Sequence, residues 1–446
     1  MKRILFIYPN ADGYQRIPLG AAIVINDLKA KGCIVELFDT TFMKAKNTDN
    51  ELREEAGFVK RTDKIGRENL SERDIEELLI NRMEAFKPEF VFASIVEDNY
   101  RYATSLFKVV KGWDEKIKII VGGTTPTVAP MVIRDNPYID HVIIGEGENR
   151  IWFDEDMGIM LKLKGEFTDL DTIPDQDFSL WDDRHFVKPY DGKLYRAGFI
   201  EMSRGCMNHC SYCVNAIYQE IFKHYGKYYR KKSVDRLIEE AITLKEENNL
   251  NMIFFTDDDF LFMNLNRFDT FVNEWVYKIN LPYWINTRTE WITEHKLRGL
   301  QINCAGIGFG IECGNEKFRN TILNRKGNNK SIIEKFKMMK DYGIRTTANF
   351  MLGFPFETEE IINDTIELAR KIKADSIDVT YVTPYYGTAL YGICADFNLI
   401  ELDTEPGFVG MAKNISMRKE PTIRNKKIKK EKVIEYYNNF QRLVNE

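Results

Sequence analysis

The sequence predicts an α/β protein: a doubly wound parallel sheet, then a partial (β/α)6 barrel, then a short helical C-terminal region. Apolar, β-branched runs alternate with helical stretches over most of the 446 residues, which is enough chain for two or three domains. A connector with Pro174 amid acidic residues, Asp169–Trp181, interrupts this alternation. We therefore expect a first domain over 1–150, a linker over 151–190, a barrel over 191–395 and a C-terminal region over 396–446.

The composition is ordinary for a soluble globular protein, with 44% hydrophobic and 29% charged residues. A net charge of −5 gives no reason to expect nucleic acid as a partner. No apolar run approaches the ~18 residues of a membrane span. Cys33, Cys304, Cys313 and Cys394 are scattered and are interpreted as buried free thiols, which suits a cytoplasmic location.

The first 150 residues carry the strand and helix pattern of a parallel sheet. A helical stretch over Leu19–Lys31 stops at Gly32. Strands separated by helices pair in parallel and place ligands at their carboxyl ends. The predicted strands are Lys2–Tyr8, Ile34–Phe38, Phe90–Val96, Ile117–Val121 and Asp140–Ile144.

Residues 44–88 depart from this pattern. Lys44–Leu70 is polar and highly charged, and is predicted to be a surface insertion or lid with no assigned role. A helix is expected from Ser71 to Phe86, with Ser71 as its N-cap and Asp74 at the N3 position.

Two glycine turns follow strands of the first domain. Gly122, Gly123 and Thr124 follow one strand, and Gly145, Glu146 and Gly147 follow another. Glycine lets the backbone approach a large planar ligand, and the turn amides can donate hydrogen bonds to it. Ordinary strand-end turns are the alternative. Neither turn has the G-x-G-x-x-G spacing of a dinucleotide site.

The barrel is predicted from a second series of strands and helices. Asp191-Gly192 is a turn between short strands, and Ser233–Lys245 is an amphipathic helix. Residues that follow the barrel strands are the site candidates, because barrel sites lie at the carboxyl ends. The predicted strands are Phe199–Met202, Asn251–Phe255, Tyr283–Asn286, Gly306–Ile311, Arg345–Met351 and Ile377–Tyr381; a last helix is expected at Lys430–Val444.

Three cysteines lie close together after the first barrel strand. Cys206, Cys210 and Cys213 have the spacing C-x3-C-x2-C. A structural zinc site normally has four ligands in two pairs, and no second pair follows here. Three thiolates can instead hold three corners of a cubane iron–sulfur cluster and leave one iron open for a small molecule.

This motif, with Tyr212 at its aromatic position, resembles that of the radical S-adenosylmethionine superfamily. The preceding Ser203-Arg204-Gly205 resembles the flank in the cobalamin-dependent branch of that superfamily. The resemblance implies a [4Fe-4S] cluster whose open iron chelates S-adenosylmethionine, and an external one-electron reductant of the flavodoxin or ferredoxin type. An electron from the cluster then cleaves the cofactor to methionine and a 5′-deoxyadenosyl radical.

The first domain resembles the cobalamin-binding domain of such enzymes. Its GG-x-x-P-T and GEGE elements match Gly122–Thr127 and Gly145–Glu148. The resemblance implies a Rossmann-like domain before a TIM-type barrel, with cobalamin between them. One departure concerns the D-x-H-x-x-G loop, which supplies a histidine to cobalt in other cobalamin domains. Here Asp12 is followed by Gly13-Tyr14, so cobalamin is expected base-off, with no histidine on the cobalt.

The resemblance also implies roles for residues at the ends of the barrel strands. Asp257 or Asp258 would receive the methionyl amino group, and a solvated turn is the alternative. Glu312 would accept from the ribose, or form a salt bridge. Lys326 or Arg325 would hold the methionyl carboxylate, or belong to an exposed basic turn. Gly353 opens the adenine-contacting turn, and no catalytic residue is identified.

The resemblance as a whole implies methylation of an unactivated carbon of a small-molecule or natural-product substrate. Such a carbon calls for a radical, because no side chain can deprotonate it. A ring contraction, cyclisation or rearrangement with the same cofactors is one alternative. A non-catalytic cobalamin or iron–sulfur sensor is another. Sequence does not identify the substrate.

Overall fold

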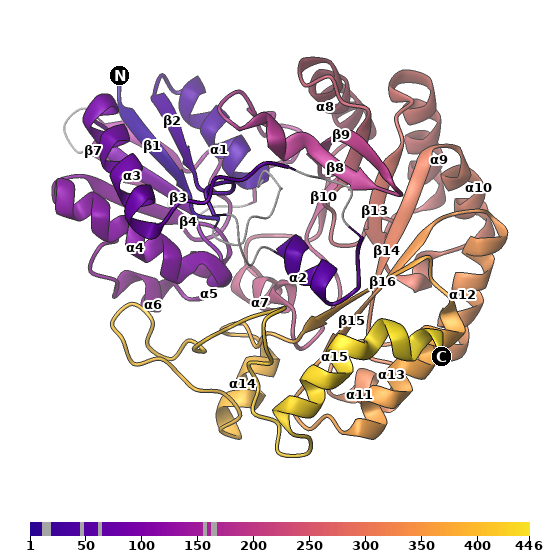
Figure 1. Cartoon of the computed structure of the whole chain (residues 1–446). Coiled ribbons are helices and arrows are strands. Elements are labelled where there is room, and N and C mark those ends of the chain that lie inside the picture. Colours follow the sequence, from indigo (N-terminus) through magenta and orange to yellow (C-terminus); the bar gives the residue numbers. More distant parts are fainter. Residues whose placement is uncertain (11–18, 45–48, 61–64, 155–157, 162–166) are drawn as a thin grey trace.

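The structure is a computed structural model that describes residues 1–10, 19–44, 49–60, 65–154, 158–161 and 167–446. Two sheets lie side by side, each with helices around it, and the barrel is the larger part (Figure 1). Among these residues, no helix is both long and apolar enough to cross a membrane.

The first sheet has five parallel strands in the order β2-β1-β3-β4-β5, so the strand order reverses between β1 and β3. Apolar side chains alternate along β1: Ile4 and Phe6 pack with α1, while Leu5 and Ile7 pack with α3 and α4. The doubly wound prediction is confirmed. The elements are β1 (Arg3–Tyr8), α1 (Leu19–Ala30), β2 (Ile34–Asp39), α3 (Glu72–Phe86), β3 (Phe90–Ser94), α4 (Glu97–Trp113), β4 (Lys118–Gly122), α5 (Thr124–Val128), α6 (Pro130–Arg134) and β5 (His141–Val142).

Helix α3 begins as predicted. The Ser71 hydroxyl accepts a hydrogen bond from the Asp74 amide, and the Asp74 carboxylate accepts from the Ser71 amide at 2.8 Å. This reciprocal capping box satisfies two amides that would otherwise lack partners.

The charged insertion crosses to the barrel. It contains α2 (Asp49–Glu55), where Asp49 accepts from Arg418 at 2.7 Å. Arg418 also donates to Asp378 of the last barrel strand at 2.9 Å, and the Phe58 ring lies 5.2 Å from that of Tyr437. The insertion therefore packs on the end of the barrel sheet and on the C-terminal helix (Figure 1).

The second sheet has seven strands in the order β16-β15-β14-β13-β12-β9-β8. All its pairs are parallel except β8 with β9, which the predicted turn at Asp191-Gly192 joins. Its end strands do not pair with each other, so the barrel is partial, as predicted. The strands are β8 (Val187–Tyr190), β9 (Lys193–Ile200), β12 (Met252–Phe255), β13 (Tyr283–Thr287), β14 (Cys304–Glu312), β15 (Thr346–Leu352) and β16 (Ser376–Tyr381).

Helices follow the barrel strands and cover the outside of the sheet (Figure 1). The buried side of α8 carries Leu237, Ala241 and Leu244, at the spacing of one helix face. These helices are α8 (Val234–Glu247), α9 (Leu265–Glu274), η2 (Trp275–Ile279), η3 (Thr289–Trp291), α10 (Glu294–Asn303), α11 (Glu316–Thr321), α12 (Asn329–Asp341) and α13 (Glu359–Ile372).

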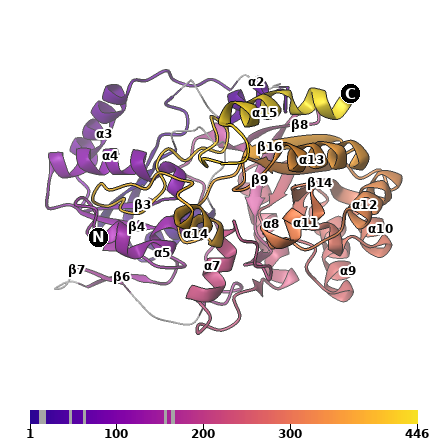
Figure 2. The same ribbon diagram turned by 90° about the horizontal axis from the view of Figure 1, so that it is seen from below.

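The predicted linker contributes a strand to the barrel, because β8 begins at Val187, before the expected boundary. The C-terminal region runs back over the first domain before its last helix returns to the barrel (Figure 2). There the Tyr100 hydroxyl donates to the Gly407 carbonyl at 2.8 Å. The remaining elements are β6 (Ile151–Asp154), β7 (Gly158–Leu161), η1 (Asp183–Phe186), β10 (Ser203–Arg204), α7 (Val214–Ile221), β11 (Arg230–Lys231), α14 (Ala389–Asp396) and α15 (Lys430–Asn445).

Candidate functional site

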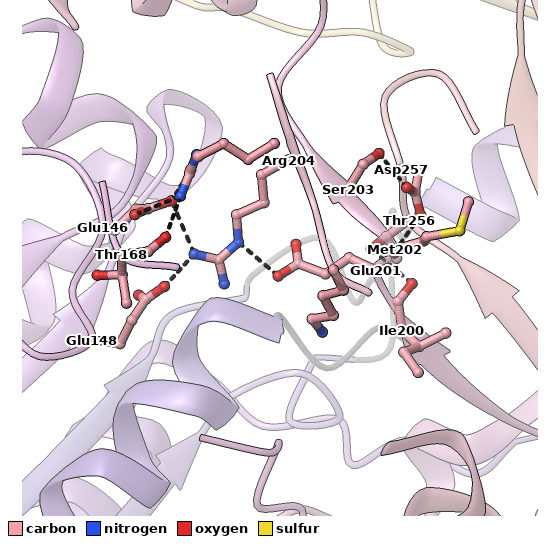
Figure 3. Close-up of polar contacts among 12 residues, drawn as sticks. Glu146, Glu148, Thr168, Ile200, Glu201, Met202, Ser203, Arg204, Thr256 and Asp257 are labelled. Atoms are coloured by element: carbon pink, nitrogen blue, oxygen red, sulfur yellow. Dashed lines mark hydrogen bonds and ion pairs between the residues drawn. The ribbon is translucent and has the colours of Figure 1, made fainter. Parts of the chain in front are cut away.

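The cysteine loop, Cys206–Cys213, connects β10 to α7 and is fixed at its start. β10 pairs antiparallel with β11. Gly205 has a φ of 90°, and a Cβ there would lie 2.8 Å from the Tyr228 carbonyl oxygen, so the backbone needs glycine. The Asp257 carboxylate accepts from the Met202 amide at 3.0 Å and from the Ser203 hydroxyl (Figure 3).

Hydrogen-bond donors surround the three sulfur atoms. The Asn208 side-chain amide lies 3.3 Å from Cys206 Sγ, and that of Asn215 lies 3.7 Å from Cys213 Sγ. Two guanidinium groups, of Arg288 and Arg325, each place Nη1 3.9 Å from Cys210 Sγ. Donors and cations stabilise anionic thiolate ligands.

The sulfur atoms do not form a site for a single ion. Among the described residues, no three histidine, cysteine or acidic side chains are placed to hold one metal ion.

The three consecutive acids after β12 differ in what they contact. Asp257 and Asp259 are buried, and Asp259 accepts from the Thr287 hydroxyl and the Trp291 indole, both at 2.7 Å. Asp258 is exposed and accepts from the Asn215 amide at 2.9 Å. Asp258 is thus the one of the two predicted acids whose carboxylate lies open beside the cysteine loop.

Glu312 ends β14 at a register shift, where its φ is 69°. Such a bulge redirects a side chain at the end of a strand. The Tyr212 hydroxyl hydrogen-bonds the Glu312 carboxylate, and the Arg325 cation lies near it. Burial raises the pKa of Glu312, although Arg325 and Tyr212 act in the opposite direction. The structure therefore brings Tyr212, Glu312 and Arg325 together beside Cys210.

Lys326 points elsewhere. Its side chain is exposed, and its Nζ donates to the Asn320 carbonyl at 3.0 Å. Its own carbonyl accepts from Arg288 at 3.0 Å. Of the two basic residues that the sequence offered, Arg325 is the one that faces the cysteines, because neighbouring residues of this turn project in different directions.

Gly353 opens the turn after β15 with a φ of 86°. Its amide donates to Glu357 Oε2 at 2.7 Å, and a Cβ would lie 3.5 Å from Pro421 of the C-terminal region. The next residue, Phe354, belongs to the same apolar cluster as Tyr212 and Cys313. The turn and the aromatic residue of the cysteine loop therefore contribute to one apolar cluster.

An interdomain cavity of about 460 Å³ lies between the carboxyl ends of the first sheet and the start of the cysteine loop. Thr256, Asp258 and Asn215 line it from the barrel. From the first domain, all six predicted turn residues line it: Gly122, Gly123, Thr124, Gly145, Glu146 and Gly147. The two turns therefore belong to one site, at the edge where open α/β sheets bind ligands.

Glycine is required in both turns. Gly123 has a φ of 107°, and a Cβ there would lie 2.6 Å from the Ile95 carbonyl oxygen. Gly145 has a φ of 84° and packs against the Phe222 ring. None of the described lining residues is histidine. The predicted departure at Asp12, Gly13 and Tyr14 lies outside the described residues.

A buried ion network joins the second turn to the cysteine loop (Figure 3). Arg204 contacts Glu146 at 3.1 Å, Glu201 at 2.7 Å, and Glu148. Arg230 also contacts Glu146 and donates to the Thr168 carbonyl at 2.8 Å. The sequence singled out Ser203-Arg204-Gly205 and the GEGE turn separately, and nothing in it indicated that they pair.

Two family profiles match the chain. The Radical SAM superfamily matches residues 200–369, and the B12 binding domain matches residues 12–151. An uncharacterized methyltransferase of Pyrococcus horikoshii is 26% identical, over 75% of this chain and 74% of that protein. The cytidylyl-2-hydroxyethylphosphonate methyltransferase of Streptomyces wedmorensis is 21% identical, over 88% of this chain and 82% of that protein. The anaerobic magnesium-protoporphyrin IX monomethyl ester cyclase of Rubrivivax gelatinosus is 23% identical, over 86% and 68%.

Solved structures share the fold. The cobalamin-dependent S-adenosylmethionine radical enzyme OxsB superposes with a TM-score of 0.64 at 13% identity, over 92% of this chain and 64% of that one. The radical S-adenosylmethionine methyltransferase TsrM of Kitasatospora setae superposes with a TM-score of 0.62 at 14% identity, over 94% and 84%. The chain thus carries a Radical SAM superfamily domain and a B12 binding domain and shares the fold of these enzymes, in agreement with the predicted cofactors: a [4Fe-4S] cluster, S-adenosylmethionine and cobalamin.

Proposed function

We propose that the protein methylates an unactivated carbon of a small molecule or natural product. The observation that carries the proposal is the interdomain cavity, where the glycine turns of the cobalamin-binding domain meet Asp258, Asn215 and Gly205 beside the cysteine loop. A substrate between the two cofactor sites can meet both a radical source and a methyl carrier without leaving the protein.

The cysteine loop supplies the first set of roles in this proposal. Cys206, Cys210 and Cys213 hold three irons of the cluster, and the amides of Asn208 and Asn215 with the cations of Arg288 and Arg325 stabilise its negative charge. The one-electron reductant is an external protein of the flavodoxin or ferredoxin type, as the sequence suggested.

The residues at the ends of the barrel strands supply the second set of roles, which concern S-adenosylmethionine. Asp258 accepts the methionyl amino group, because the Asp257 carboxylate already accepts two hydrogen bonds from residues 202 and 203. Arg325 takes the methionyl carboxylate in place of Lys326, since its guanidinium faces the cysteines. Glu312 accepts from the ribose, and the turn that Gly353 opens contacts adenine.

The first domain supplies the third set of roles, which concern cobalamin. The backbone of Gly122, Gly123 and Thr124 and of Gly145, Glu146 and Gly147, which lines the cavity, would hold the cobalamin. The mixed lining of apolar side chains and hydroxyls suits a large ring with polar side groups, and base-off binding follows if no histidine reaches the cobalt. When bound, the cofactors supply a 5′-deoxyadenosyl radical for hydrogen abstraction and a transferable methyl group.

A rearrangement or cyclisation is the second candidate, because one relative carries the name of a cyclase. The two reactions differ in what becomes of S-adenosylmethionine. Methylation consumes one molecule as methyl donor and one as radical source, so S-adenosylhomocysteine and 5′-deoxyadenosine form in about equal amounts. A rearrangement yields 5′-deoxyadenosine without labelled product.

The deciding experiment uses anaerobically reconstituted protein with methyl-deuterated S-adenosylmethionine and a panel of candidate substrates, followed by mass spectrometry. A product that carries the deuterated methyl group supports the proposal. A substrate-dependent rise in 5′-deoxyadenosine with an unlabelled product would move the protein to the second candidate. Cys210→Ala should lose iron and 5′-deoxyadenosine, whereas Cys394→Ala, at a buried free thiol far along the chain, should retain both.

A further inference from the structure

We propose that Arg204 is a positioning residue that fixes the cobalamin-binding turn at a set distance from the iron–sulfur cluster. The proposal rests on the proposed function only in its assignment of cobalamin to this turn and of the cluster to the cysteine loop. Its evidence is the buried ion network that connects the turn Gly145–Glu148 to the cysteine loop (Figure 3).

The network crosses from one domain to the other at the cofactor sites. Arg204 stands two residues before Cys206, and Glu146 lies between the two glycines that line the interdomain cavity. One guanidinium contacts Glu146 and Glu148 of the first domain as well as Glu201 of the barrel. Any movement of the turn relative to the cysteine loop must therefore break contacts of Arg204.

Burial makes these contacts costly to break. Exposed ion pairs contribute little, but a buried charge that loses its partner is strongly unfavourable. The side chains of Arg204 and Glu148 are 17% and 3% exposed, and Arg204 is the ion-pair partner of Glu148 within the described part of the chain. Glu146 is 14% exposed and is also held by Arg230, from the strand paired with β10. The turn is thus tied to both strands that carry the start of the loop.

The chemistry calls for arginine at this position. A planar guanidinium presents five donors and can contact three carboxylates from fixed directions, whereas the ammonium group of lysine is a compact point charge. Lysine at 204 would keep the charge but hold fewer of the three acids. We therefore expect Arg204→Lys to fall between wild type and Arg204→Gln.

The experiment measures the relation between the cofactors directly, and it needs no substrate. The full chain is reconstituted with iron, sulfide and hydroxocobalamin, then reduced with dithionite so that cob(II)alamin and the reduced cluster are both paramagnetic. Their magnetic coupling, seen as splitting or broadening of the electron paramagnetic resonance spectrum, depends on their separation and orientation. Iron content and bound corrin are determined on the same samples.

The variants are Arg204→Gln, Arg204→Lys and Glu148→Gln, with Arg101→Gln as the matched control. Arg101 also forms an interdomain ion pair, with Glu405 at 3.3 Å, but it does not line the cavity. We expect Arg204→Gln and Glu148→Gln to keep iron and corrin at wild-type stoichiometry and to lose the wild-type coupling. Arg204→Lys should retain part of it, and Arg101→Gln should retain it fully.

Wild-type coupling in both Arg204→Gln and Glu148→Gln would overturn the proposal, and so would an equal loss in Arg101→Gln. If Arg204→Gln cannot be loaded with iron, the coupling measured in Glu148→Gln tests the proposal instead, because Glu148 lies outside the cysteine loop. Failure of the proposed function can be distinguished from failure of this proposal. If the wild-type protein transfers no labelled methyl group but its magnetic coupling still depends on Arg204, methylation is refuted and the positioning role stands.

Discussion

Glu357 lies in the turn after β15 and should make the stability of the protein fall as the pH rises. Its side chain is completely buried; Oε2 accepts from the Gly353 amide at 2.7 Å, and Oε1 has no partner among the residues that the structure describes. Burial raises the pKa of this carboxyl from 4.5 to about 8. The folded chain therefore keeps a proton up to about pH 8 that the unfolded chain releases above pH 4.5.

The sign and size follow from this difference. The contribution of Glu357 is complete below pH 4.5 and is lost as the pH rises through the folded-state pKa of about 8. Because one pH unit corresponds to 1.36 kcal/mol, the loss between pH 5 and pH 9 is about 4 kcal/mol. This is a large part of the 5–15 kcal/mol that stabilises a typical domain.

The assay compares wild type with Glu357→Gln by denaturant unfolding of the protein without cofactors at pH 5, 7 and 9. Glutamine can still accept from the Gly353 amide and cannot ionise. Its extra amide hydrogens lower stability by a constant amount, so the informative quantity is the change with pH. Glu360→Gln, at an exposed position three residues on, controls for the loss of a carboxylate. A difference between wild type and Glu357→Gln that stays constant from pH 5 to pH 9 would refute the reasoning.

Three further substitutions test other parts of the structure. Arg288→Gln removes a cation 3.9 Å from Cys210 Sγ and should lower the cluster potential, because the cation favours the more negative reduced state. A preference of about 1 kcal/mol corresponds to about 40 mV in a redox titration, and Arg298→Gln, at an exposed residue, should leave the potential unchanged. Gly123→Ala forces a Cβ to 2.6 Å from the Ile95 carbonyl oxygen, so corrin binding should be lost while iron is retained; Gly112→Ala, where a Cβ meets nothing within 4 Å, should bind both. Arg418→Met leaves Asp49 and Asp378 without this partner and should cost about 3–5 kcal/mol in denaturant unfolding, against less than about 1 kcal/mol for the exposed pair of Arg424.

Features set by short stretches of sequence were predictable. The strands of the first sheet follow from apolar runs, and the start of α3 follows from Ser71 and Asp74, because a capping box needs only residues three apart. The spacing of Cys206, Cys210 and Cys213 indicated a cluster for a similar reason, since all three lie on one loop. The full length of the strand β9 was not predictable, because its first residues, from Lys193, are exposed and lack an apolar pattern.

Features that depend on the direction of a side chain were not predictable. Asp257 and Asp258 are adjacent and chemically identical, yet one is buried against residues 202 and 203 and the other is exposed. Arg325 and Lys326 differ in the same way. In each case the backbone conformation of a turn determines which of the two neighbours faces the site. The side-chain repeats of strands (two residues) and helices (3.6 residues) do not predict side-chain directions in a turn.

Contacts between distant segments were also not predictable from the sequence. These contacts determine how the two candidate cofactor sites are placed relative to each other. The rules for open sheets and barrels place ligands at the carboxyl ends of each set of strands. They do not predict how the ligand-binding edges of the two sheets are placed relative to each other. That relation depends on pairs such as Arg204 with Glu148, and Arg418 with Asp49 and Asp378. The first pair lies between the two candidate cofactor sites, and the second contact joins the insertion and the barrel to the C-terminal region. The domains are thus joined by buried charges at separate places, and each network must lose contacts if the segments that it joins move apart.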